Sequence, residues 1–375
     1  MPTSTTSSAR APSLGFEPSD EQKTLVESVR RFASRELRAR AREADERAEL
    51  PSDLTAAGSA LALLPASLPE AYGGFGERSA LTGALFAEEL AWGDLSAAVA
   101  LLAPSLVALP VLLAGTEAQK KEILPAFCGE GYVAGAAALL EPRHDFDPWR
   151  LQTRATRAGD GYVLDGVKCN VPGAASAEWT LIYAALEGRT QAFLVKKGTP
   201  GLEVGPREAN MGLRAAPLHP VTLRHCRMPA ALRLGGETAA DLAPLIDSAR
   251  VALAALAVGQ ARAAYEYALD YAKSRTAFGE AIAQRQAIAF MLAEMATEIE
   301  AARLLVWEAA WTLDAGHPAT REACLAKTFA DDMVLQVTDR AVQVLGGHGY
   351  IRDHPVEMWL RNGRGFAVME GLAMV

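Results

Sequence analysis

The stretch AVQVLGGHGY, residues 341–350, joins an apolar run to a turn that contains paired glycines. Gly-Gly after an apolar run commonly ends a helix, because glycine accepts the left-handed backbone conformation found just after a helix. Glycines also allow another backbone or a ligand to approach closely, since they have no Cβ atom. This stretch is therefore either a plain helix end or a ligand-contacting turn. Other parts of the sequence are needed to distinguish the two.

The sequence around this stretch has a helical, then β-type, then helical texture. An early helical zone begins at Ser19-Asp20-Glu21-Gln22, where Ser19 or Asp20 can cap a helix. From 132 to 229 short β-type runs alternate with turn residues, and Gly159-Asp160-Gly161 is typical of a hairpin. From 239 to 344 apolar residues recur at steps of three and four, as in a bundle helix, most clearly at Ile288, Met291, Leu292, Met295 and Ile299.

These textures predict an α+β fold that is mostly α. We expect a disordered tail at 1–15, an N-terminal helical domain at 16–131, a central antiparallel β-domain at 132–236, and a C-terminal helical bundle at 237–375.

Composition and charge restrict the class of protein. The net charge of −8 argues against nucleic acid as the main partner. The most apolar stretch, 95–114, is interrupted by Pro104 and Pro110, so we expect a buried helical region and no membrane span. The four cysteines have neither zinc-type spacing nor a disulfide-framework pattern. We therefore predict no metal site and a reduced, cytoplasmic setting.

Five strings resemble those of the flavin-dependent acyl-CoA dehydrogenase family, in the family's order and spacing. The strings are LPEAYGGFG at 68–76, GTEAQKK at 115–121 followed by Leu124-Pro125, SRTAFG at 274–279 followed by Gln286, AVQVLGGHGY at 341–350, and Glu370-Gly371. The resemblance covers about 16–375. It implies that the C-terminal domain is a four-helix bundle and that the chains assemble as dimers or as homotetramers made of dimers. It also implies FAD between the β-domain and the bundle, with its adenosine half reaching a neighbouring chain.

The reaction implied by the resemblance is α,β-dehydrogenation of an acyl thioester. A carboxylate takes the weakly acidic α-proton while the thioester carbonyl is polarised, so base and polarising donor must act together. Glu370 occupies the position of that base, and its backbone N–H would polarise the carbonyl. By its sequence context alone, Glu370 would instead be a surface residue near a helix end. The alternative position for the base, which some family members use, is Ala249 in this chain and is therefore empty.

Further residues match the binding positions of the family. Asp247, Arg250 and Gly371 match residues that line the acyl-thioester site, although Asp247 and Arg250 also have the i, i+3 spacing of a surface ion pair. An Arg fork suits a pyrophosphate, and an exposed, solvated Arg is the plainer alternative. The positions that match cofactor contacts are Leu140, Arg275, Phe278, Gln286, Gln343, Gly346 and Gly347.

The flavin-facing strings of the β-domain depart from the family pattern. Residues 140–147 read LEPRHDFD where TEPxAGSD is usual, and 168–174 read KCNVPGA where KxWITNG is usual. Hydroxyl and aromatic flavin contacts are thereby replaced at Leu140, Phe146, Asn170 and Pro172, and again at Leu372 after Glu370-Gly371. Asp145 stands where the family has Gly and places a carboxylate near the position of the pyrophosphate.

Three functions remain open from the sequence. One is a flavoenzyme of lipid and fatty acid metabolism that oxidises an acyl-CoA or acyl-carrier-protein thioester and passes electrons to electron-transfer flavoprotein. A second is the flavin-deficient subunit of a heteromeric acyl-CoA dehydrogenase, since the contacts donated to a neighbour's flavin are kept. The third is a redox-inactive binding protein for acyl thioesters. Oxidases and monooxygenases also share this fold.

Overall fold

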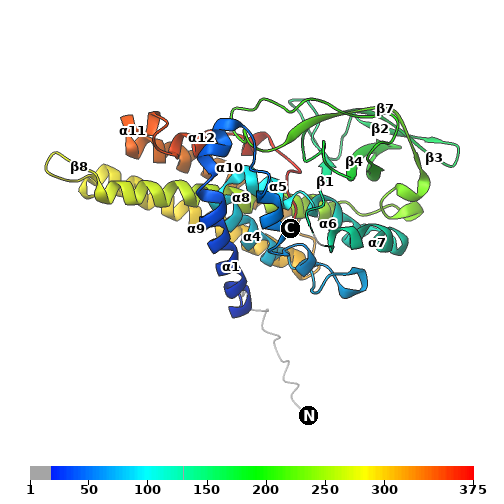
Figure 1. The fold of residues 1–375 in the computed structure, drawn as a ribbon, viewed down its shortest axis with the longest axis horizontal. Coiled ribbons are helices and arrows are strands. Elements are labelled where there is room, and N and C mark those ends of the chain that lie inside the picture. The colour runs from blue at the N-terminus through cyan, green and yellow to red at the C-terminus, as the bar shows by residue number, and fades with distance from the viewer. Residues whose placement is uncertain (1–17, 130) are drawn as a thin grey trace, which may run out of the picture.

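The computed structural model describes residues 18–129 and 131–375, in three zones that follow each other along the chain (Figure 1). The tail expected at 1–15 lies outside the described residues. The N-terminal zone contains helices α1 (Asp20–Phe32), α2 (Ala41–Arg47), α3 (Leu54–Ser59), α4 (Ala80–Gly93), α5 (Leu95–Leu102), α6 (Ser105–Ala114) and α7 (Glu117–Ile123). A π-helical segment, Ala33–Arg38, continues α1.

The first helix begins where the sequence predicts. Ser19 is the N-cap of α1: its hydroxyl accepts a hydrogen bond from the backbone N–H of Gln22, and the Gln22 side chain accepts one from the N–H of Ser19. This reciprocal capping satisfies two backbone donors that the first helical turn leaves free.

The middle zone is one curled sheet. Its strands are β1 (Gly135–Ala138), β2 (Arg154–Ala158), β3 (Gly161–Pro172), β4 (Trp179–Leu186), β5 (Arg189–Lys196), β6 (Leu202–Val204) and β7 (Leu218–Pro229). The order is β1-β4-β2-β3-β7-β6, with β5 paired to β4. The hairpin predicted at Gly159-Asp160 is confirmed, because β2 and β3 pair in antiparallel register across it. Most pairs are antiparallel, whereas β4 runs parallel to β1 and β2.

The C-terminal zone is built around α8 (Ala243–Ser274). The other elements are α9 (Gln286–Asp314), α10 (Thr320–Leu345), α11 (Gly347–Tyr350), α12 (Val356–Gly363), and a short hairpin of β8 (Thr276–Ala277) and β9 (Glu280–Ala281). Helix α8 packs against α4, α9, α10 and α12. A Cβ atom at Gly259 would lie 2.1 Å from the carbonyl oxygen of Glu88, so α4 can approach α8 this closely only at a glycine.

The helical spacing predicted for α9 is confirmed. Leu292, Met295 and Ile299 are buried in the bundle, and Ile288 and Met291 pack partly buried against it. Charged side chains also cross this interface: Arg262 of α8 forms ion pairs of 2.7 Å with both Glu88 and Glu89 of α4. The positive charge of Arg262 compensates both carboxylates, because a charge buried between helices needs a partner of opposite sign.

The apolar stretch at 95–114 forms α5 and α6, and both helices are buried inside the fold. No described helix is by itself long and apolar enough to cross a membrane; α5 and α6 reach that length only as a pair bent by 41°. The described residues also contain no cluster of His, Cys, Asp and Glu that could hold a metal ion.

Candidate active site

A polar cleft of about 350 Å³ lies where the β-domain meets α8, α10 and the C-terminal segment. Its lining comes from the loop after β1, from the first turns of α8, from one face of α10, and from residues 367–370. The lining residues are Leu140, Arg143, His144, Phe146, Arg250, Cys324, Lys327, Thr328, Asp331, Ala367, Val368, Met369 and Glu370. The fold therefore brings Leu140, Arg250 and Glu370 together from distant parts of the sequence.

Glu370 faces this cleft with one oxygen held and one free. Its Oε1 lies 3.5 Å from Nε of Arg250, and Arg250 also donates a hydrogen bond of 3.1 Å to Sγ of Cys324. The second oxygen, Oε2, is buried and accepts no hydrogen bond from the described residues. Gly371 has φ +70°, and a Cβ atom there would lie 3.1 Å from Leu139 Cβ, so glycine lets the chain turn beneath β1. A carboxylate with an unpaired buried oxygen is a suitable proton acceptor.

Asp247 lies one turn before Arg250 on α8 but lines a different cavity of about 680 Å³. It accepts a hydrogen bond of 2.8 Å from the hydroxyl of Thr320, and burial raises the pKa of its carboxyl. Because Asp247 is only 2% exposed, the alternative of a surface ion pair is wrong. The structure therefore does not bring Asp247 and Glu370 into one cavity.

Lys327 and Asp331, one turn apart on α10, are site residues that the sequence analysis missed. Nζ of Lys327 lies 2.6 Å from Oδ2 of Asp331 and donates a hydrogen bond of 2.9 Å to the carbonyl of Phe366. The other oxygen of Asp331, Oδ1, is buried and accepts no hydrogen bond from the described residues. Burial, helped by the charge of Glu370, raises the pKa of Asp331 to about 6 despite Lys327. The i, i+4 spacing of opposite charges was the available signal, but it also fits a solvated helix face.

Replacing Asp331 with Asn should change how stability depends on pH. The folded state holds the Asp331 proton up to about pH 6, whereas the ordinary aspartate value is 3.8. Between these values the folded wild type binds more protons than its unfolded chain, so its stability relative to Asp331→Asn should fall as pH rises from about 4 to about 6. Urea unfolding of both proteins across this range measures the difference. A difference that stays constant, or that grows with pH, contradicts the environment described for Asp331.

The apolar side chains next to Glu370 leave almost no empty space. Met369 and Leu372 line a void of only about 10 Å³. Its walls are completed by Leu95, Val99, Leu213, Leu253, Leu256, Asn362 and Phe366. This void is too small to admit a ligand chain beside the Glu370 segment.

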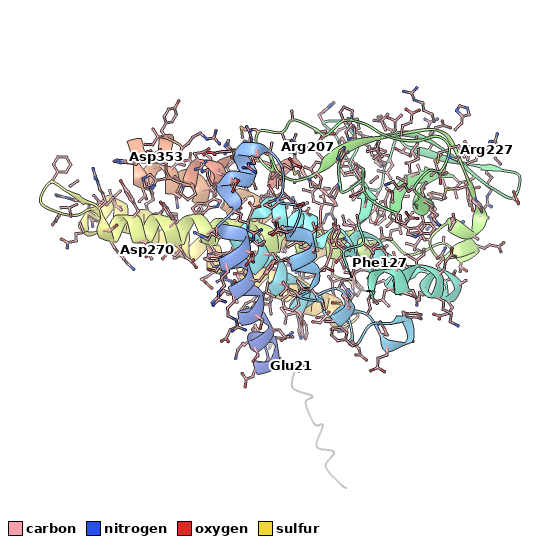
Figure 2. The ribbon with its side chains drawn as sticks, viewed as in Figure 1. Glu21, Phe127, Arg207, Arg227, Asp270 and Asp353 are labelled. Carbon is pink, nitrogen blue, oxygen red and sulfur yellow. The ribbon has the colours of Figure 1, made fainter. Side chains whose placement is uncertain are left out.

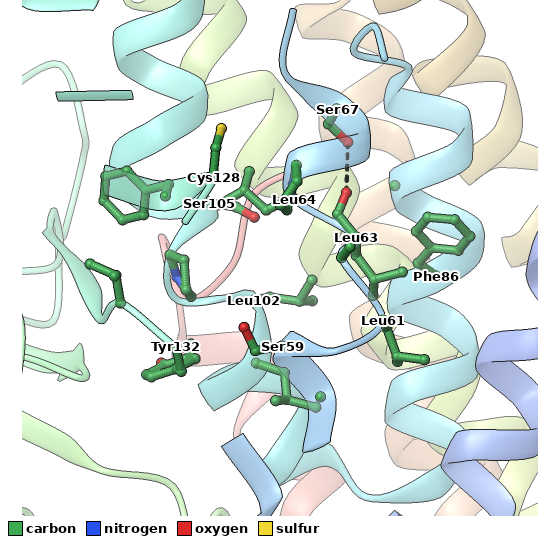
Figure 3. Close-up of a pocket in the computed structure, with 18 of the residues that line it drawn as sticks. Ser59, Leu61, Leu63, Leu64, Ser67, Phe86, Leu102, Ser105, Cys128 and Tyr132 are labelled. Atoms are coloured by element: carbon green, nitrogen blue, oxygen red, sulfur yellow. Dashed lines mark hydrogen bonds between the residues drawn. The ribbon is translucent and has the colours of Figure 1, made fainter. Parts of the chain in front are cut away.

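A larger apolar pocket of about 410 Å³ lies among α3–α6 and the loop before β1 (Figure 3). Its lining includes Leu63, Leu64, Phe86 and Leu102, together with Ser59, Ser105 and Tyr132. None of its described lining residues also lines the polar cleft. A ligand group held at Glu370 is therefore not continuous with this pocket.

A buried ion pair, Lys168–Glu141, lies next to Leu140, which lines the cleft. Lys168 of β3 is completely buried, and its Nζ donates hydrogen bonds of 3.0 Å to the carbonyl of Leu139 and to Oε1 of Glu141. Glu141 also accepts hydrogen bonds from the backbone N–H groups of Gln152 and Thr153. Burial lowers the pKa of Lys168 to about 8. The pair fixes the loop after β1, which presents Leu140 to the cleft.

The other predicted cofactor residues lie at the far end of the bundle. Arg275 caps α8, Phe278 follows in the β8–β9 hairpin, and Gln343, Gly346 and Gly347 lie where α10 ends. Phe278 is 95% exposed. Figure 2 shows Asp270, near this end, and Arg227 of the β-domain at opposite ends of the molecule. Arg250 and Arg275 are separated by 25 helical positions, or about 37 Å at 1.5 Å per residue. Within one chain, then, this distal set and Glu370 do not form one site.

Gln286, also predicted to bind the cofactor, is the first residue of α9 and is exposed at this same end. Gly346 caps α10, with φ +58°, so the paired glycines end this helix, and their contact with a cofactor stays a prediction. Gly347 has no atom within 4 Å of a Cβ position, so no contact inside the described chain requires a glycine there.

Comparison with known proteins agrees with this arrangement. Models of the acyl-CoA dehydrogenase N-terminal, middle and C-terminal domains match residues 19–130, 136–226 and 242–374. Cyclohex-1-ene-1-carbonyl-CoA dehydrogenase of Geobacter metallireducens is 38% identical over 353 residues, 92% of this chain and 93% of that protein.

Two solved structures show the same fold. Butyryl-CoA dehydrogenase from Megasphaera elsdenii superposes with a TM-score of 0.87 at 33% identity, covering 95% of each chain. A FAD complex of PigA superposes with a TM-score of 0.87 at 27% identity, again over 95% of each chain. The three matching domains, in order and over nearly the whole length, establish that this chain belongs to the acyl-CoA dehydrogenase family.

Proposed function

We propose that the chain catalyses α,β-dehydrogenation of an acyl thioester, with Glu370 as the base. The observation that carries this proposal is the free Oε2 of Glu370, buried in a cleft beside Arg250. Arg250 holds the other oxygen, which orients the carboxylate while leaving Oε2 able to accept the α-proton. The backbone N–H of Glu370 would polarise the thioester carbonyl. The relatives named as acyl-CoA dehydrogenases support the reaction class.

The cofactor that we propose is FAD, which when bound accepts the hydride that leaves the β-carbon. The cleft fits a flat ring with an anionic tail in part: Leu140 and Phe146 offer apolar surface, and Arg143 offers positive charge, part of which Asp145 compensates at 2.8 Å. The loop offers no hydroxyl at Leu140 or Phe146, and the N–H of Asn170 already donates to Oε1 of Glu208. Flavin binding in this cleft would therefore depend more on stacking and charge than on side-chain hydroxyls.

The distal set would contact the cofactor of a second chain. Arg275, Phe278 and Gln343 are exposed and lie too far along the bundle to reach the cleft of their own chain. We therefore propose assembly into dimers or tetramers in which each chain completes its neighbour's cofactor site. Electron-transfer flavoprotein is the acceptor that we propose from the family resemblance, and the thioester carrier is CoA or acyl-carrier protein.

A bulky side chain at Gly347 should separate folding from cofactor binding. In Gly347→Leu the new Cβ atom would have no atom of the described chain within 4 Å. The free energy of unfolding should therefore stay within about 0.5 kcal/mol of wild type. The same side chain would block a neighbour's approach, and FAD affinity of the assembled protein should fall at least tenfold. Equilibrium dialysis with FAD and urea unfolding measure the two effects. Gly129→Leu, which also meets open space, is the matched control; unchanged FAD affinity in Gly347→Leu contradicts the proposed contact.

The first test of the proposed function is the visible absorbance spectrum of the purified chain after addition of excess FAD. Near one FAD per chain supports a flavoenzyme, and turnover of acyl thioesters should follow. An absence of bound flavin supports the second candidate, a flavin-deficient subunit that lends the distal set to a related chain. Two observations favour this candidate. Leu140 and Phe146 have no side-chain donors for a flavin of their own chain, whereas the residues of the distal set are exposed and match the family.

A further inference from the structure

The cations that line the cleft already have partners within the described chain, whereas each of its carboxylates keeps one oxygen without a donor there. Its cations are engaged: Arg143 pairs with Asp145 at 2.8 Å, Arg250 contacts Glu370 and Cys324, and Lys327 contacts Asp331 and the carbonyl of Phe366. Its carboxylates are each half engaged, because Oε2 of Glu370 and Oδ1 of Asp331 are buried without a donor among the described residues. Among these charged groups, the capacity left for a ligand is therefore mainly capacity to accept hydrogen bonds.

The two free oxygens need different explanations. Oε2 of Glu370 must be free to take the α-proton in the proposed reaction. Oδ1 of Asp331 has no part in that reaction, yet an unsatisfied buried acceptor carries a cost in free energy that evolution rarely retains without a partner. Lys327 pairs with the other oxygen, Oδ2, and the Asp331 side chain is one of those that line the cleft.

The apolar surroundings restrict the length of an acyl group at Glu370. The void beside Met369 and Leu372 measures about 10 Å³, too little for even a methylene chain to enter. The 410 Å³ apolar pocket shares no described lining residue with the cleft. An extended alkyl chain bound at Glu370 would have to remain in the cleft, against Asp331, Lys327 and Thr328.

We propose that the substrate's acyl group is short and carries a hydrogen-bond donor, an ammonium or a hydroxyl, which Oδ1 of Asp331 accepts. Asp331 is then the residue that selects this donor, while Met369 and Leu372 exclude longer alkyl chains from the bundle. This inference rests on the proposed function, because it places the acyl group between Glu370 and Asp331. A plain alkyl group of equal length would leave Oδ1 unpaired after water is displaced, which lowers its affinity.

The test compares thioesters that differ only in the donor. β-Alanyl-CoA and butyryl-CoA have the same number of heavy atoms in the acyl group, as do 4-hydroxybutyryl-CoA and pentanoyl-CoA. Dissociation constants are measured by calorimetry with FAD-loaded Glu370→Gln protein, so that no thioester is consumed. In each pair the donor-bearing thioester should bind at least about tenfold more tightly, as a hydrogen bond to a charged acceptor predicts.

Asp331→Asn, made in the same background, should remove most of this preference. Asp332→Asn, at the exposed neighbouring position of α10, is the matched control and should keep it. Equal or tighter binding of butyryl-CoA and pentanoyl-CoA by the Asp331 protein overturns this inference and leaves the proposed function standing. Failure to bind any of the four thioesters overturns both. Because the wild-type residue at 331 is tested with matched ligands, the result stands even if Asp331→Asn does not fold.

Discussion

Glu370→Gln should lower turnover of an acyl thioester by at least about 10²–10⁴-fold, the contribution typical of a positioned general base. The amide keeps the shape of the side chain and can still contact Arg250, but its free atom no longer accepts the α-proton as a carboxylate does. Thioester binding should change little, since Oε2 accepts no hydrogen bond from the described residues. Steady-state dehydrogenation and calorimetric binding, measured on the same preparations, separate the two effects.

The control for this variant is Glu294→Gln on α9. Glu294 pairs with Arg340 at 2.8 Å on the protein surface, far less buried than Glu370, and its loss should leave turnover unchanged. Turnover of Glu370→Gln equal to wild type would show that another group takes the proton. A parallel loss of thioester affinity and turnover would instead identify Glu370 as a binding residue.

Lys168→Met should destabilise the protein by roughly 3–5 kcal/mol, the cost typical of removing one partner of a buried ion pair. The methionine can fill the space of the lysine stem, but Glu141 would keep a negative charge at a site with 3% exposure. The carbonyl of Leu139 would lose its donor as well. Because Leu139–Glu141 presents Leu140 to the cleft, FAD affinity should fall together with stability.

Chemical denaturation of wild type and Lys168→Met at pH 7 measures the loss. Lys196→Met is the matched control, because Lys196 lies 3.7 Å from Glu178 in a pair that is more than half exposed. Exposed pairs of this kind contribute about 0–1 kcal/mol. A similar small loss in both variants would mean that Glu141 is satisfied by the N–H groups of Gln152 and Thr153 alone. The double variant Lys168→Met/Glu141→Gln should regain part of the lost stability.

Much of the fold followed from local patterns. The Ser19 capping box, the Gly159-Asp160 hairpin and the three-and-four spacing on α9 are each decided by neighbours within a few residues, so one sequence is enough to predict them. The parallel alignment of β4 with β1 and β2 was not predicted, because it depends on pairing between residues 31 to 44 positions apart in the sequence. Texture along the chain carries no information about that pairing.

Some residues of the candidate site were likewise predictable from the sequence, and others were not. Glu370 was reached through a family string and Arg250 through the wider resemblance to the family, and the structure brings them to 3.5 Å. Asp247, one turn from Arg250, faces another cavity, because the direction of a side chain around a helix depends on what packs against each face. Lys327 and Asp331 were missed for the same reason: the spacing of a solvated ion pair and that of a buried one are identical in sequence.

By itself, the sequence determined the order of the three domains, the helix and hairpin signals, and the five strings that mark the family. The tertiary structure alone decided which polar atoms are left without partners, which cavity each side chain lines, and that the distal set cannot serve the cleft of its own chain. The physical reason is that burial and hydrogen-bond satisfaction are properties of surroundings assembled from distant segments. The free oxygens of Glu370 and Asp331 exist only because β1, α8, α10 and the C-terminal segment meet at one cleft.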